Sequence, residues 1–305
     1  VLRAQVYVNN YWWPIWVTLT AAFLVAAAAL KLNTLRDLET AFIAAKPGRK
    51  YAFPWLQSTL GLVLRLERTT IIGWAVGMLV LGASYGSIYG EVESFIQTSE
   101  LYQQMLPSVV GYSLLDQFTA TLLSVMSMIA AVPALLVVFK LRGEERVNRT
   151  EHLLARAVSR SRLMGSFVGT ALLTAVLMQV LSVLGLWAAA SAVVENPFNL
   201  GEITAAALAY VPLIWILIGT GAALIGLAPK RAGLAWLYLG YTFFVMFIGK
   251  MLQLPAWLEK LTPWGYIPNV PLEPLKTGVL LLTLLTAAVL IGLGFYGYRK
   301  RDLYG

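Results

Sequence analysis

Long uncharged stretches, separated by short clusters of charged residues, dominate the sequence. Seven of these stretches are long enough for a helix to cross the hydrocarbon core of a membrane, which takes about 20 residues. They cover residues 11–30, 70–90, 117–139, 163–194, 203–228, 232–249 and 277–298. The pattern predicts an all-α, polytopic membrane protein with about seven transmembrane helices.

Composition supports this class and excludes most soluble chemistry. Hydrophobic residues make up 59% of the chain and charged residues only 12%, outside the range of soluble globular proteins. The absence of cysteine excludes disulfides, thiolate metal sites and cysteine nucleophiles, and His152 is the single histidine. No phosphate-binding GxxxxGK[ST] loop is present. We therefore expect no catalytic residue, no metal site and no cofactor on this chain.

The basic residues divide unequally between the two faces that the spans define. Of the 23 Lys and Arg residues, all except Arg3, Lys250, Lys260 and Lys276 fall on one face. Short loops rich in Lys and Arg are typical of the cytoplasmic side, and clustered charge between apolar spans fits lipid headgroups rather than nucleic acid. The distribution predicts a multi-pass plasma-membrane protein with a cytoplasmic carboxyl terminus. An odd number of spans then places Val1 outside the cell.

An extracytoplasmic start without a preceding basic segment has two explanations. A cleaved secretory signal is one. The other, which we prefer, is that the chain is the second half of a duplicated permease. Residues 1–50 would then hold the last transmembrane helix of the preceding half and a cytoplasmic linker, and residues 51–305 a six-helix permease domain.

Three segments between the predicted spans have patterns of their own. Residues 55–68 have apolar residues at helical spacing among charges, which suits either a helix lying in the headgroup region or an early start of the second span. Residues 91–107 are typical of a short polar helix. Residues 254–271 contain four prolines with Trp257 and Trp264, which predicts a broken hairpin dipping into the outer interface.

The most informative segment is the loop KLRGEERVNRTEHLLARAVSRSRL, residues 140–163. Acidic residues early and Arg156 late predict a short helix over residues 144–157. Val147, Leu154 and Val158 recur on one face of that helix, and Leu153 widens the apolar stripe. Such a helix could be a lever held in a groove of a soluble partner, or a solvated amphipathic loop on the lipid surface.

At this loop the sequence resembles the type-2 permeases of ATP-binding-cassette (ABC) exporters, most closely the polyketide-antibiotic exporters. The shared features are the paired glutamates Glu144 and Glu145, the later Glu151, a leucine pair and the S-R-x-R ending at Ser159. Residues 254–271 are similar to that family's outer hairpin, and YRKRDL, residues 298–303, to its terminal basic motif. Ala157 stands where the family often has proline.

The resemblance implies a coupling helix that docks on a separate ATPase subunit, with ATP and Mg bound by that partner. It also implies a second permease half, fused or separate. The implied coupling residues are Glu144, Glu145, Arg146, Arg149, Glu151, Leu153, Leu154 and Arg156.

The same resemblance implies export of an amphiphilic or hydrophobic compound, such as an antibiotic, a drug or a lipid-like molecule, by alternating access. Neutral polar and flexible residues in the spans are candidates for the pathway, although such residues also serve ordinary helix packing. They are Gln117, Ser124, Ser127, Gln179, Tyr241 and Met246. Two other classes stay open: an ion-coupled secondary transporter, for which we see no ionisable midplane residue, and a non-transporting regulatory subunit.

Overall fold

The computed structural model describes residues 12–34, 53–91, 112–155, 158–194, 198–249 and 251–301. Every regular element among these residues is a helix. The chain divides into two compact units, residues 1–52 and 53–305. The predicted polar helix over residues 91–107 falls almost entirely outside the described residues.

The first unit contains one described helix, α1 (Trp13–Thr34). None of its side chains is buried within the unit, and Lys31 in the last turn is its only charged residue. Its 22 residues span about 33 Å, slightly more than the roughly 30 Å hydrocarbon core of a bilayer. A helix that is apolar on every side is typical of a membrane span.

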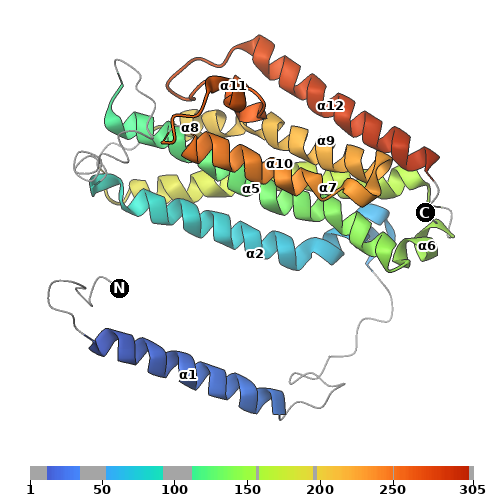
Figure 1. The fold of residues 1–305 in the computed structure, drawn as a ribbon, viewed down its shortest axis with the longest axis horizontal. Coiled ribbons are helices and arrows are strands. Elements are labelled where there is room, and N and C mark those ends of the chain that lie inside the picture. Colours follow the sequence, from blue (N-terminus) through green and yellow to red (C-terminus); the bar gives the residue numbers. More distant parts are fainter. Residues whose placement is uncertain are drawn as a thin grey trace. The chain divides into compact units, whose positions relative to one another are not determined.

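The second unit is a bundle of long helices (Figure 1). Its main elements are α2 (Thr59–Ser87), α5 (Leu114–Arg146), α7 (Arg160–Ala190), α8 (Leu200–Leu208), α9 (Val211–Leu227), α10 (Leu234–Phe243) and α12 (Thr277–Lys300). Shorter elements are η2 (Pro54–Gln57), η3 (Tyr89–Glu91), α6 (Arg149–Leu154), η4 (Pro229–Arg231), the π-helical η5 (Phe244–Ile248), α11 (Ala256–Glu259) and η6 (Pro263–Tyr266). Together with α1, seven helical segments are long and apolar enough to cross a membrane, which confirms the predicted fold class.

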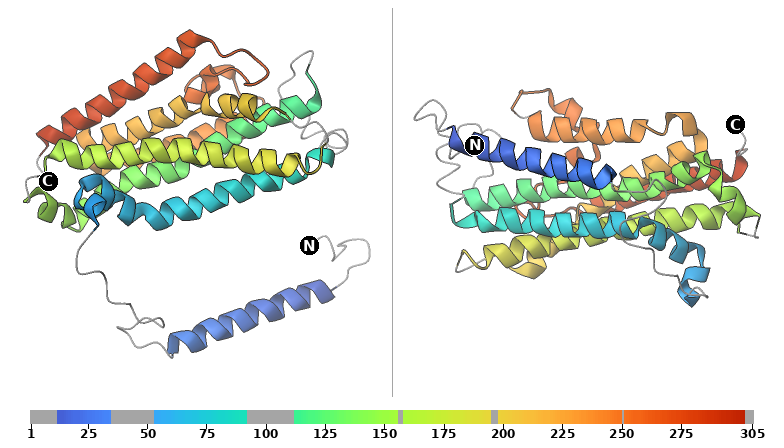
Figure 2. Two further views of the ribbon diagram at one scale, coloured as in Figure 1. Left: turned by 180° about the vertical axis from the view of Figure 1, so that it is seen from behind. Right: turned by 90° about the horizontal axis from the view of Figure 1, so that it is seen from below.

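Helix α5 forms the centre of this bundle. It contacts both α7 and α9, and about half of its residues are buried. Figures 1 and 2 show α2 and α12 along opposite sides, each packed on one inner helix, α2 on α7 and α12 on α9. A capping box begins α5: Asp116 N–H donates to Ser113 Oγ, and the Asp116 carboxylate accepts the Ser113 N–H, both at 3.1 Å.

Glycines permit the two closest helix contacts. A Cβ at Gly82 of α2 would lie 2.0 Å from the Ser182 carbonyl oxygen of α7, and one at Gly185 would lie 2.1 Å from the Leu79 oxygen. On the other side of the bundle, a Cβ at Gly226 of α9 would lie 2.2 Å from the Gly294 oxygen of α12. In lipid, such close backbone approach supplies the packing attraction that holds helices together.

Most spans extend beyond their uncharged cores, because charged residues continue the helix into the headgroup region. Helix α2 begins at Thr59, so the early start of the second span, one of the two alternatives for residues 55–68, is confirmed. The predicted fifth span, residues 203–228, is broken into α8 and α9. Pro212 explains the break, since its ring would clash with the carbonyl of residue 208, where α8 ends.

The hairpin segment, residues 254–271, contains α11 and η6 as two short helical turns. Its two tryptophans have different environments: Trp257 is 60% exposed, whereas Trp264 is 2% exposed. The two separate turns confirm that this segment is broken, and Trp264 lies in the bundle core. The position of the hairpin in the outer interface stays a prediction.

We expect Gly82→Ala to destabilise the bundle by about 1–3 kcal/mol, because the added methyl group meets α7 backbone atoms that cannot rotate away. Gly77→Ala on the same helix is the matched control, since nothing lies within 4 Å of its Cβ position. Both changes raise helix propensity equally. Thermal unfolding in detergent measures the difference, and equal midpoints for the two variants would contradict the α2–α7 contact.

Candidate functional site

The loop that carries the functional prediction lies at one end of the bundle, which we call the basic end: α2 begins there, α5 and α12 end there, and α6 lies there. Helix α5 continues to Arg146, and the chain then turns at Asn148, whose φ is 55°. Asparagine tolerates this left-handed conformation better than most residues. Helix α6 follows, so the predicted continuous helix over residues 144–157 is wrong. Arg156 and Ala157 lie outside the described residues.

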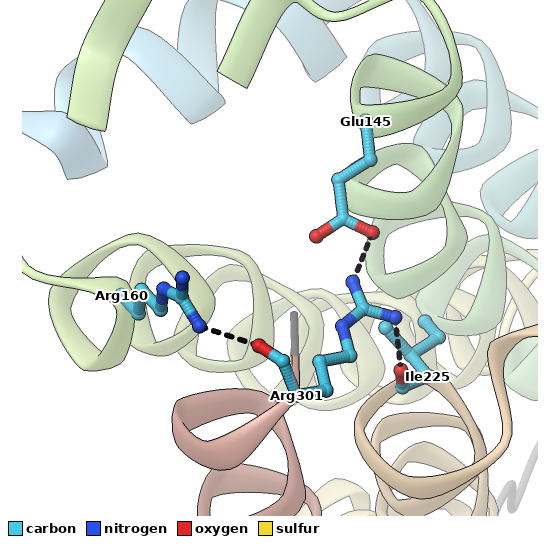
Figure 3. A network of polar contacts seen from close by, with 4 residues as sticks. All are labelled: Glu145, Arg160, Ile225 and Arg301. Carbon is cyan, nitrogen blue, oxygen red and sulfur yellow. Dashed lines mark hydrogen bonds and ion pairs between the residues drawn. The ribbon is translucent and has the colours of Figure 1, made fainter. Parts of the chain in front are cut away.

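Arg301, one residue beyond α12, is the centre of a polar network at this end (Figure 3). Its Nη2 pairs with the carboxylate of Glu145 on α5, and its Nη1 donates to the Ile225 carbonyl oxygen of α9 at 2.7 Å. Its own carbonyl oxygen accepts from Arg160 Nη1 of α7 at 2.6 Å. Its guanidinium also lies 5.0 Å from the Tyr298 ring centre. One residue therefore joins the ends of α5, α7, α9 and α12.

This network is sheltered from water. The side chain of Arg301 is 16% exposed and that of Glu145 is 13% exposed. Removing one partner of such a sheltered pair leaves a poorly solvated charge, which costs far more than breaking a surface pair. The planar guanidinium suits this position because its donors point in several fixed directions.

Glu144 forms a second cluster beside this network. Its carboxylate lies 3.5 Å from Lys140 Nζ and 3.5 Å from Arg149 Nη1. Glu67 of α2 is buried close by, within the electrostatic influence of Lys140 and Glu144. Glu67 and Glu144 are therefore two sheltered carboxylates at the basic end, and Lys140 is the lysine that pairs with Glu144.

The other predicted coupling residues divide between surface and core. Arg146 and Glu151 are exposed, whereas Leu154 and Val158 pack against the bundle core. Val147 is 57% exposed. Among the described side chains of the predicted apolar stripe, Val147 therefore faces away from the bundle, whereas Leu154 and Val158 face it. The side chain of Leu153 is outside the described part of the chain.

Two of the predicted pathway residues hold the hairpin through Trp264. Its Nε1–H donates to Ser127 Oγ at 2.7 Å, and Ser127 Oγ donates to the Ser124 carbonyl oxygen at 2.6 Å. Ser127 lies about 20 Å along α5 from Leu114, so the hairpin penetrates far into the bundle. The Ser124 side chain also lies near Tyr210, in the turn between α8 and α9.

The remaining pathway candidates lie in separate places. Gln179 is fully buried and donates to the Ala207 carbonyl oxygen at 2.9 Å, and Gln117 donates to the Tyr112 oxygen at 3.2 Å. Tyr241 donates to the Leu258 carbonyl oxygen of α11 at 3.0 Å. Met246 in η5 is half-buried and packs against the core. The six residues do not meet at one point, and their role in a pathway stays a prediction.

The sequence patterns did not identify three residues that have structural roles in the bundle. Arg301 was visible only as one charge of the YRKRDL motif, and Trp264 as an interfacial aromatic residue. Glu67 looked solvated because Arg65 and Arg68 flank it, yet it follows Val63 by four residues and shares its buried face. The spacing from Val63 is the signal that could have identified it.

We expect Arg301→Gln or Glu145→Gln alone to lower the free energy of unfolding by about 2–4 kcal/mol, because each leaves the other charge sheltered and unpaired. The double variant should cost clearly less than the sum of the two. Denaturation in mixed detergent micelles measures this cycle, with exposed Arg299→Gln as the control. Strict additivity would contradict the pair.

Trp264→Phe should destabilise the protein by about 1 kcal/mol, since it removes a buried hydrogen bond to Ser127. Trp257→Phe makes the same chemical change at an exposed position and should alter stability by less than about 0.5 kcal/mol. The same unfolding assay compares the two variants. If both behave alike, Trp264 does not anchor the hairpin.

Comparison with known proteins agrees with this architecture. The family model described as "Multidrug efflux system permease Rv1217c, C-terminal domain" matches residues 56–299. The chain is also 29% identical over 304 residues to the multidrug efflux system permease protein Rv1217c of Mycobacterium tuberculosis (strain ATCC 25618 / H37Rv). That match covers 99% of this chain and 56% of the relative, so the chain spans about half the length of the curated relative. The chain belongs to this family of efflux-system permeases, through its C-terminal domain, and the resemblance to ABC exporter permeases is confirmed.

Proposed function

We propose that this chain is the membrane-spanning permease of an ATP-driven exporter that moves amphiphilic or hydrophobic compounds out of the cell. ATP and Mg bind to a separate ATPase subunit, and a second permease half, fused or separate, completes the transporter. The printed name of the relative, a multidrug efflux system permease, supports the export of drug-like compounds. The basic end is the cytoplasmic side in this proposal, in line with its excess of Lys and Arg.

The observation that carries the proposal is the Arg301 network. An ATPase that pushes on the segment from Glu144 to Leu154 acts on a segment already tied to three other helices. Because Glu145 and Arg301 are sheltered, their contact resists separation, and the ends of α5, α7, α9 and α12 move together. The partner's binding energy then reaches helices on both sides of the bundle.

The hairpin completes the mechanism at the opposite end. In alternating access, the far side of the pathway must close while the cytoplasmic side is open. Trp264, Tyr238 and Tyr241 hold the hairpin through hydrogen bonds to Ser127 Oγ and to the carbonyl oxygens of Leu261 and Leu258. Release of the exported compound would break these hydrogen bonds and also open the packing around the buried Trp264. Each hydrogen bond contributes about 1 kcal/mol, which ATP-driven movement can overcome.

The test of this proposal uses two exposed positions, because changing Leu154 would also disturb the bundle core. Val147→Asp and Glu151→Arg should weaken copurification with the ATPase and lower substrate-stimulated ATP hydrolysis at least severalfold. Glu202→Arg, the same charge change at the exposed start of α8, is the control and should leave both unchanged.

The measurement requires the complete transporter, reconstituted with its ATPase in proteoliposomes. Unchanged association and coupling in both variants would overturn the role of this segment. Transport that survives ATP depletion but stops when the ion gradient collapses would instead favour an ion-coupled transporter.

A further inference from the structure

A cavity at the basic end does not belong to the polar network or to the hairpin. It has a volume of about 230 Å³ and lies between the first turns of α2 and α7, beside α6. Leu62, Val63 and Leu66 of α2 and Leu163 and Phe167 of α7 form the apolar part of its wall. An apolar cavity of about 150 Å³ in another protein stays dry and binds benzene. This cavity is larger, so a hydrocarbon group is its natural occupant.

The opening of the cavity is polar and positively charged. Arg149 and His152 of α6 contribute to its lining, and the Arg149 side chain is 68% exposed. Arg149 Nη1 lies 3.5 Å from Glu144, a long contact for a charged pair, and the exposed guanidinium carries further donors that can reach a ligand. Glu144 also lines the cavity, but Lys140 and Arg149 already balance its charge.

The neighbouring helix ends add to the positive potential. Arg65 and Arg68 of α2, Arg146 of α5 and Arg162 of α7 are exposed close in sequence to the residues that line the cavity. The carboxylates of this region are mostly engaged: Glu67 is buried, Glu144 contacts two cations and Glu145 pairs with Arg301. Glu151 is exposed and reduces the potential only in part. An anionic head group therefore fits the opening better than a cationic one.

We propose that this cavity binds an anionic phospholipid, with the first part of one acyl chain in the cavity and the phosphate at Arg149 and His152. The direction fits a lipid, because α2 and α7 both begin at the basic end and run from there into the span, as the acyl chain of a membrane lipid does. The bound lipid joins α6 to the bundle at the point where the ATPase is proposed to act.

The test measures lipid binding to the purified permease by native mass spectrometry, without any ATPase, so its outcome does not depend on the proposed function. The probes are dioleoyl phosphatidylglycerol, dioleoyl phosphatidylcholine and glycerol phosphate without acyl chains. We expect binding of phosphatidylglycerol at least about tenfold tighter than of phosphatidylcholine. Glycerol phosphate should not compete, because it cannot fill the apolar cavity.

Two variants separate the head-group contact from the acyl-chain contact. Arg149→Gln should weaken phosphatidylglycerol binding about tenfold, while Arg231→Gln, the same change in an exposed turn after α9, should not. Leu163→Trp should fill the cavity and reduce binding even though it keeps every charge. Thermal unfolding shows whether each variant is folded, and any variant that is not is replaced by Phe167→Trp or His152→Gln.

The proposal is overturned if folded Arg149 and cavity-filling variants bind phosphatidylglycerol as the unchanged protein does. Equal binding of phosphatidylcholine would also overturn it, since the basic opening would then select nothing. Displacement of the lipid by glycerol phosphate would show an anion site without an acyl-chain site.

Discussion

Within the hydrocarbon core of a bilayer no water is available to bind a free N–H or C=O group, and this constraint governs the whole structure. It explains why every regular element among the described residues is helical. It also explains where polar side chains point. Thr170 and Thr174 donate to carbonyl oxygens of their own helix, and Gln179 donates to the Ala207 carbonyl oxygen, which also accepts the Tyr210 N–H at the α8–α9 break. Polar side chains in the spans therefore serve mainly as hydrogen-bond partners for the backbone of the protein itself.

The same medium removes the hydrophobic force between helices, so contact must come from close packing and hydrogen bonds. Gly82 and Gly185 bring the α2 and α7 backbones together, and Gly226 and Gly294 do the same for α9 and α12. The hairpin is instead held by hydrogen bonds, with Trp264 donating to Ser127 in the middle of α5. Close backbone packing and side-chain hydrogen bonds differ in how easily they break and re-form. Backbone contact makes stable helix pairs, while a few side-chain bonds allow a movable gate in the proposed transport cycle.

At the basic end, water and lipid headgroups can solvate charged side chains, so a charge costs less free energy there than inside the span. Arg301 gathers the ends of four helices, while the cavity beside α6 is apolar with a cationic opening. The proposed ATPase contact and the proposed lipid site therefore lie at the same short segment. If both proposals hold, the state of the membrane would influence how firmly that segment transmits movement to the bundle.

The sequence by itself determined the class, the number of spans, the unequal division of charge and the hairpin, because these depend on local hydropathy and on proline. Pro212 was also a local signal for a helix break, but the uncharged stretch around it is long enough for one span and was predicted as one. The burial of Glu67 also had a local signal, its spacing of four residues from Val63. Only the tertiary structure decided that Trp264 meets Ser127 and that Arg301 meets Glu145. Those pairs are separated by many residues and span both sides of the bundle, so no local pattern could join them. Helix–helix packing selects which of many similar polar residues become partners, and packing exists only in the folded chain.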